Sequence, residues 1–120
     1  MKHQEITETI LGSAMKVHSH FGRGFAEIIY QRSLKIELEE KGFKCGLEVG
    51  KNIYYKGVLV GKRRLDLIVN DKVLVELKAI SELDWLEYNN VVNYLKVFNI
   101  EVGLLLNFGS KSLQFKRFVH

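Results

Sequence analysis

The sequence predicts an α/β (α+β) fold in which a mixed β-sheet is flanked by helices, in the element order α-α-β-β-β-α-β-β. Three observations support this prediction. The first forty residues or so carry apolar side chains at helical spacing. Short apolar stretches with intervening turn residues then indicate strands, and a further helical stretch separates the last two strands from the others.

Two helices are expected at the start of the chain. The first is predicted over about His3 to His20, because apolar residues recur there at steps of three and four, as an amphipathic helix requires. Gly22 and Gly24 interrupt it, and a second helix is predicted over Phe25 to Lys41, burying Tyr30, Leu34 and Leu38. Gly42 would follow in the C′ position that favours glycine.

The middle of the chain predicts the first part of a sheet. Apolar residues from Leu47 to Tyr55 indicate one or two strands, and Lys56-Gly57 supplies a turn. Two further strands are predicted over Val58 to Val69 and Val73 to Ala79, around the polar break at residues 70–72. These last two strands should form a hairpin.

A third helix and two more strands complete the pattern. Ser81, with Asp84 three residues later, resembles a capping box, and Asn99 is the expected C-cap. A strand over Val102 to Asn107 is apolar enough to be buried on both faces, and a last strand spans Leu113 to Val119. The helix between Ser81 and Asn99 would carry the apolar residues Leu83, Leu86, Val91, Tyr94, Leu95 and Phe98.

The bulk properties bound the class of protein. A chain of 120 residues suits one domain, residues 1–120, and a composition 47% hydrophobic and 27% charged is typical of a folded globular protein. No apolar run is long enough to cross a membrane, and the first residues lack the apolar stretch of a secretory signal. Cys45 is the sole cysteine, which excludes an internal disulfide and suits a reducing cytoplasm.

A net charge of +4 is compatible with a phosphate-bearing partner, and equally with an ordinary solvated surface. The four histidines show no zinc-type grouping, because His18 and His20 are two residues apart and face different sides of a helix. We interpret the histidines as surface or packing residues. Oligomeric state is left open, with a homodimer among the alternatives.

Two carboxylates, Asp66 and Glu76, stand among apolar residues in the middle of the two hairpin strands. Buried charges are costly unless they have a partner, a metal or a solvent-filled cleft. The alternative is that both point outward on an exposed sheet face. Register decides whether they meet, because directly opposed residues share a face with Cβ atoms roughly 5 Å apart.

A two-residue loop at Asn70-Asp71 would set Asp66 opposite Val75 and leave the carboxylates on opposite faces. A three-residue loop, residues 70–72, sets Asp66 opposite Glu76, with Lys78 on the same face; this is the register we predict. Asp66 and Glu76 would then bind Mg²⁺ or Mn²⁺, since hard cations prefer carboxylate oxygens. Lys78 would orient the attacking water or stabilise charge on the phosphate.

These residues resemble a known signature. Asp66 followed after nine residues by Glu76-Leu77-Lys78 is similar to the core motif of the PD-(D/E)xK nuclease superfamily, with Leu65 in place of the proline. Residues 24–30 also contain a full copy of the motif that names the GxxExxY proteins, a family of small domains in that superfamily. Further stretches that resemble this family are residues 55–57, Gly61 followed by residues 64–66, and residues 76–79, 93–96 and 103–109.

The resemblance implies a restriction-endonuclease-like core and further site residues. Glu27 would join Asp66 and Glu76 at the metal as a third carboxylate, although its place near a helix N-terminus is sufficient structural reason for it. Within the same motif, Gly24 would allow the tight turn into the helix, and Tyr30 would be a core aromatic.

The helix after the lysine strand carries a Q-x-x-x-Y element in many nucleases of this superfamily. Asn90 and Tyr94 stand in its place, with asparagine where glutamine is usual, and their spacing keeps them on one helical face. Tyr94 as a residue packed on the sheet is the alternative. Lys62 and Arg64, which precede Asp66, are the basic residues assigned to substrate binding.

Together these features predict a Mg²⁺-dependent nuclease that cleaves DNA, with RNA left open. One alternative is an inactive nuclease-like module that binds nucleic acid or a protein partner, since fold does not by itself transmit activity. Another is an oligomerising accessory domain whose basic surface is incidental.

Overall fold

The computed structural model describes all residues, 1–120, and has three helices and a mixed sheet of five strands in the predicted order. The elements are α1 (Gln4–Phe21), α2 (Glu27–Glu40), β1 (Cys45–Tyr55), β2 (Val58–Val69), β3 (Val73–Lys78), α3 (Trp85–Phe98), β4 (Val102–Asn107) and β5 (Gln114–Val119). The α+β fold class is therefore confirmed, and it is consistent with a restriction-endonuclease-like fold. None of the helices is both long and apolar enough to cross a bilayer.

The sheet follows the chain order β1-β2-β3-β4-β5. Only β3 and β4 pair in parallel; the other neighbours are antiparallel. The parallel pair needs a crossover, and α3 provides it. Every residue of β4 is buried, as its continuous apolar sequence predicts.

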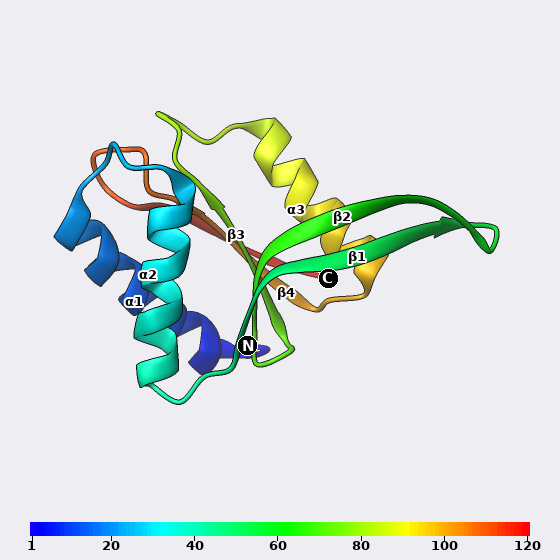
Figure 1. Cartoon of the computed structure of the whole chain (residues 1–120), viewed down its shortest axis with the longest axis horizontal. Helices are drawn as coiled ribbons and strands as arrows, with labels where there is room; N and C mark the ends of the chain where they lie inside the picture. Colours follow the sequence, from blue (N-terminus) through cyan, green and yellow to red (C-terminus); the bar gives the residue numbers. More distant parts are fainter.

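Two apolar layers enclose this sheet, with α1 and α2 on one face and α3 on the other (Figure 1). The larger cluster joins Ile10, Tyr30 and Leu34 of the helical pair to alternate strand residues such as Val75 and Leu77. The smaller cluster joins Val91 and Leu95 of α3 to strand residues on the opposite face of the sheet, including Leu74 and Leu105. The centre of the sheet, β3 and β4, is thus held from both sides.

Several helix ends differ from the predictions. Helix α2 begins at Glu27 instead of Phe25, and α3 begins at Trp85. The capping box of α3 is formed by Asp84 and Glu87, so the prediction that Ser81 and Asp84 form it was wrong by one turn. Leu83 consequently precedes the helix, and Leu86 is exposed. Asn99 at φ 54° and Gly42 at φ 83° end their helices as predicted.

Strands β1 and β2 extend well beyond the rest of the sheet as a two-stranded ribbon (Figure 1). Their turn, Lys56-Gly57, has positive φ at both residues (49° and 79°), which is the geometry of the two-residue turn favoured in twisted hairpins. Strand β3 pairs only with Leu67, Ile68 and Val69 of β2. The remaining part of β2 has β1 as its only strand neighbour.

Gly109 offers a test of how closely the β4–β5 connection packs on the end of β3. A Cβ at Gly109 would overlap the backbone N and O of Ile80, which cannot move aside as a flexible side chain can. Gly109→Ala should therefore lower the free energy of unfolding by roughly 1–3 kcal/mol, measured by urea denaturation.

Gly12→Ala is the matched control, because a Cβ at this helical position meets nothing within 4 Å. It should raise the free energy of unfolding by roughly 0.5–1 kcal/mol through helix propensity. Equal effects of the two substitutions would contradict the packing described here.

Candidate functional site

Strands β2 and β3 separate at the point where the two acidic residues face each other. Their pairing runs from Val69 opposite Val73 to Leu67 opposite Val75, which confirms the predicted three-residue loop. The next pair in this register is Asp66 opposite Glu76, where backbone pairing has stopped. The two carboxylates therefore lie in the fork between the strands.

Side chains replace the missing backbone hydrogen bonds in this fork. The backbone N–H of Leu77 donates to Asp66 Oδ2 at 2.9 Å, and the N–H of Asp66 donates to Glu76 Oε1 at 3.5 Å. The two carboxyl groups are also close enough for a hydrogen bond when Glu76 is protonated, and this raises the pKa of Glu76. The alternative in which both point outward on an exposed sheet face is excluded, because Glu76 is buried.

Burial dominates the electrostatics of Glu76. Its side chain is buried (relative exposure 7%) and it forms no ion pair with a basic residue within 4.0 Å. Desolvation, with the hydrogen bond and negative charge of Asp66, raises the pKa of Glu76 to about 9, despite opposing contributions from the Asp66 backbone and Lys78. A cation beside Glu76 would therefore stabilise its ionised form.

Lys78 and Glu27 complete the charged group. Burial raises the pKa of Glu27, the positive charge of Lys78 counteracts this, and the negative charges of Asp66 and Glu48 reinforce it. Lys78 acts in the same direction on Glu76, so its ammonium group influences two of the three predicted carboxylates. Lys78 makes no salt bridge of its own.

Two hollows open from the fork, one toward each helical layer. A hollow of about 240 Å³ is lined by Asp66, Leu77, Glu48 and the α2 residues Glu27, Ile28 and Gln31. A small one of about 30 Å³ is lined by Glu76, Lys78 and, from α3, Asn90 and Tyr94 among others. The structure therefore brings Asn90 and Tyr94 beside Glu76 and Lys78, on one face of α3 as their spacing predicts.

A comparison with protein-family models matches residues 4–118 to the PD-(D/E)XK nuclease superfamily. The chain belongs to the PD-(D/E)XK nuclease superfamily. Neither the curated proteins nor the solved structures include a match to this chain. The match identifies the superfamily, and membership of the GxxExxY family within it stays a prediction.

The superfamily is typically dependent on a divalent metal ion. No group of three or more His, Cys, Asp or Glu side chains is arranged to hold one. Asp66 and Glu76 nevertheless meet with no basic partner between them, and oxygen donors suit a hard cation. The pair fits Mg²⁺ or Mn²⁺ in chemistry, while Glu27 lies across the larger hollow from it.

Sequence reasoning missed two residues of this candidate site. Glu48 lies opposite Asp66 in the β1–β2 register, between the pairs Leu47–Leu67 and Val49–Leu65. Its own φ is 53°, and the two strands do not pair at this position. The Gln31 side chain donates a hydrogen bond to the backbone O of Asp66 at 2.6 Å. Signals for both existed, because Glu48 stands between Leu47 and Val49 as Asp66 stands between leucines, and Gln31 follows Glu27 by one helical turn.

Gly24 and Tyr30 of the motif shape the loop that leads into Glu27 at the start of α2. Gly24 adopts φ 115°, in a region that disfavours other residues, just before α2. Tyr30 is fully buried, stacks on Phe108 with ring centroids 4.6 Å apart, and donates its hydroxyl hydrogen to Gly22 O at 2.6 Å. The tyrosine thus fixes the loop that leads into Glu27, as a core aromatic.

Asn107, at the end of β4, holds the chain just after Lys78. Its side chain is fully buried, accepts from the N–H groups of Ile80 and Gly109 at 3.0 Å, and donates to Ile80 O at 2.9 Å. The backbone N–H of Phe108 also donates to Lys78 O at 2.8 Å. These bonds fix the carboxyl end of β3, where Lys78 lies.

The remaining predicted residues line neither hollow of the fork. Arg64 is exposed on β2 with Nη1 3.9 Å from Glu48 Oε2, and Lys62 is exposed without an acidic partner. His18 is buried and bonded to Ser110 O, which agrees with a packing role.

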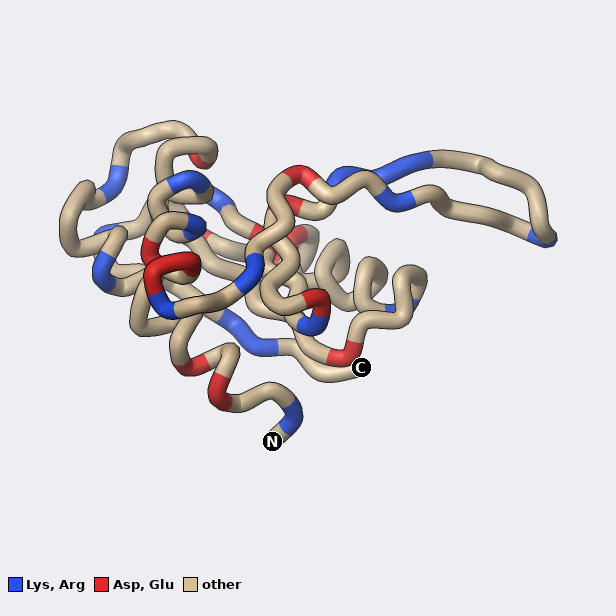
Figure 2. Tube along the Cα trace, turned by 60° about the horizontal axis from the view of Figure 1, so that its bottom comes forward, with Lys and Arg blue, Asp and Glu red and all other residues tan.

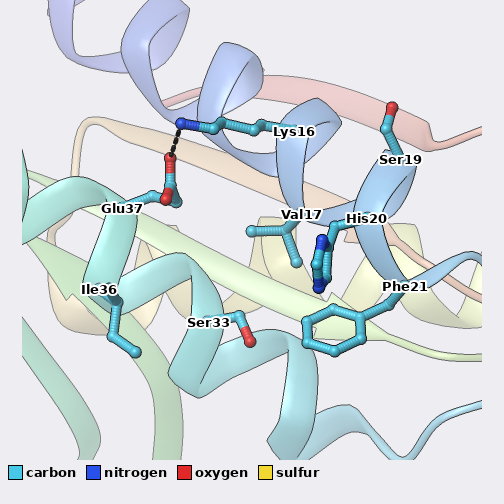
Figure 3. A pocket seen from close by; sticks show the side chains of 8 residues that line it. All are labelled: Lys16, Val17, Ser19, His20, Phe21, Ser33, Ile36 and Glu37. Carbon is cyan, nitrogen blue, oxygen red and sulfur yellow. Dashed lines mark ion pairs between the residues drawn. The ribbon is translucent and has the colours of Figure 1, made fainter.

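Another hollow, of about 520 Å³, lies between α1 and α2 and is lined by residues such as His20, Phe21 and Ser33 (Figure 3). Its one acidic residue, Glu37, is already paired with Lys16 at 3.1 Å. This hollow contains none of the superfamily's acidic residues.

The raised pKa of Glu76 predicts how metal-free stability depends on pH. The unfolded chain ionises this group near its ordinary pKa of 4.5, whereas the folded chain holds the proton until about 9. The contribution of Glu76 to the free energy of unfolding is therefore fully present below pH 4.5. It is lost as pH rises toward 9, by up to about 1.4 kcal/mol per pH unit. Glu76→Gln should gain stability relative to the parent between pH 5 and pH 8.

Denaturant unfolding in chelator at several pH values measures this difference. Asp71→Asn, which changes an exposed acid paired only with Lys44, is the control and should leave the pH profile unchanged. A parent and Glu76→Gln variant with parallel profiles would show that Glu76 is ordinarily ionised.

Proposed function

We propose that this chain is a Mg²⁺- or Mn²⁺-dependent nuclease that hydrolyses phosphodiester bonds of DNA, with RNA as a further substrate class to be tested. The observation that carries the proposal is the pair of hydrogen bonds that hold the Asp66 and Glu76 carboxylates in the strand fork, with Lys78 on the Glu76 side. Superfamily membership supports a nuclease-like function. We further propose that residues 1–120 act as one domain in a reducing cytoplasm.

Each residue has a distinct role in this proposal. Asp66 and Glu76 would hold the cation, and Glu27 would approach across the larger hollow as a third carboxylate. A bound divalent cation polarises the scissile phosphate and lowers the pKa of a coordinated water. Lys78 would orient the attacking water and offset the negative charge that develops on the phosphate.

The residues of α3 and β2 would bind the substrate around this centre. Asn90 and Tyr94 line the hollow that contains Lys78, so their amide and hydroxyl groups are placed to contact a nucleotide there. Arg64 and Lys62 lie on β2 a few residues before Asp66, where their positive charges would contact phosphates. The shorter Asn90 side chain, in place of glutamine, reduces the reach of this contact.

A catalytically inactive module that binds nucleic acid or a protein is the second candidate. It is favoured by Asn90, which lines the hollow beside Lys78 where many nucleases of the superfamily carry a glutamine. Activity assays separate the two candidates, because only the first requires Asp66 and Lys78 for turnover.

Cleavage should require both the ion and the lysine. We expect purified protein to cut linear, circular or single-stranded DNA with Mg²⁺ or Mn²⁺ and to be inactive in chelator. Asp66→Asn and Lys78→Met should each lower the rate by about 10²–10³-fold, because each removes a charge that acts on the transition state. Asp71→Asn should cut at the parent rate.

Gel-based assays with labelled DNA and RNA substrates measure these rates. If no substrate is cut, or if the Lys78→Met variant cuts as well as the parent, the nuclease proposal fails.

Metal binding should be detectable without turnover. At a Mg²⁺ concentration of 100 times Kd, a ligand that binds only the folded chain stabilises it by about 2.7 kcal/mol. Calorimetric scans should show this gain in the parent and in Lys78→Met, but little in Asp66→Asn or Glu76→Gln. A gain of equal size in all four proteins would place the cation elsewhere.

A further inference from the structure

The projecting part of the β1–β2 ribbon, residues 50–64, is here called the arm. It carries five basic residues, Lys51, Lys56, Lys62, Arg63 and Arg64, and no acidic residue. The rest of the chain has one more acidic than basic residue, so the whole net charge of +4 comes from the arm. Figure 2 shows these basic positions spread along both strands and the tip of the ribbon.

The fold gives four of these five charges no acidic partner. Only Arg64 approaches an acid, Glu48, and that contact is 3.9 Å long. Lys51 and Arg63 stand directly opposite each other, as like charges that destabilise a free ribbon. An isolated two-stranded ribbon is itself only marginally stable in water. The arrangement is therefore unfavourable until an anion neutralises it.

Both faces of the arm are charged. Lys51 and Arg63 share one face, while Lys62 and Arg64 alternate with them on the other. Toward the tip, Tyr54 and Tyr55 are 61% and 65% exposed, and Val58, Leu59 and Val60 are exposed as well. A surface with positive charge on two sides and an apolar end fits a groove that has phosphates along both walls.

The dimensions favour one kind of groove. Two strands about 4.8 Å apart form a ribbon that the roughly 12 Å wide major groove of B-form DNA admits. The major groove of an RNA double helix is deep and narrow and excludes such an element. The arm is also continuous with the site, since Arg64 precedes Asp66 by two residues.

We propose that the arm is a DNA-binding element that lies in the major groove of a B-form duplex, with its basic residues on the phosphates. The proposal deepens the proposed function, on which it rests for the role of presenting the duplex to Asp66. It selects duplex DNA over duplex RNA as the molecule that the protein binds. Duplex binding by the arm does not itself need the metal.

The test measures affinity for a fluorescent 20-base-pair DNA duplex, and for the RNA duplex of the same sequence, in chelator at several salt concentrations. The arm variant is Lys51→Gln, Lys62→Gln and Arg63→Gln together. The matched control removes the same charge elsewhere, by Lys41→Gln, Lys72→Gln and Lys96→Gln, three exposed lysines without ion pairs. Circular dichroism checks that both variants are folded.

We expect the arm variant to bind DNA at least tenfold more weakly and its salt dependence to fall by about two to three counterions, at roughly 0.9 per phosphate contact. The control variant should bind within twofold of the parent. RNA duplex should bind the parent at least tenfold more weakly than DNA. A parent that binds DNA through the arm but cuts nothing supports this inference while contradicting the proposed function.

Three results would overturn the inference. They are equal DNA affinity of the parent and the arm variant, equal affinity of the parent for the two duplexes, and occupation of the arm by a second copy of the chain. The last would appear in light scattering as a dimer that Tyr54→Ser with Leu59→Ser dissociates without any change in DNA affinity.

Discussion

The hydrogen bond from the Leu77 N–H to the Asp66 carboxylate is the interaction on which the site depends. In a continuous β2–β3 ladder this N–H group would donate to a backbone oxygen of β2. Here it donates to the Asp66 side chain, at the point where the two strands separate. Glu76 accepts from the Asp66 N–H in the same gap. Because buried N–H groups must find acceptors, the fork and the acidic pair stabilise each other.

The rest of the fold holds this fork open and rigid. Tyr30 and Gln31 of α2 fix one side, through the loop before Glu27 and through the backbone of Asp66. Asn107 fixes the other side by bonding the chain beyond Lys78. The cost of keeping Glu76 buried without a cation is the physical reason to expect one.

Separation of β2 from β3 also releases the arm. Once β2 leaves the sheet, only β1 accompanies it, and neither helical layer extends over the tip (Figure 1). The same constraint therefore produces the acidic pair at the base of the fork and a positively charged ribbon beyond it. An acidic centre next to a basic extension suits a substrate that carries both a scissile phosphate and neighbouring ones.

Much of this was predictable from the sequence. Helical spacing and turn residues give the eight elements in order, and the odd residue count of the loop at residues 70–72 gives the register that joins Asp66 to Glu76. Local patterns failed where tertiary contacts decide. Glu48 reaches the site through an irregular backbone position, and the length of the unsupported ribbon depends on where β3 stops pairing.

The direct test of the account is a crystal structure of the protein soaked in Mn²⁺, with the anomalous signal of manganese used to locate the ion. We expect a peak in the strand fork, in contact with carboxylate oxygens of both Asp66 and Glu76. A structure in which manganese binds elsewhere, or in which the fork carries no anomalous peak at saturating Mn²⁺, would contradict it.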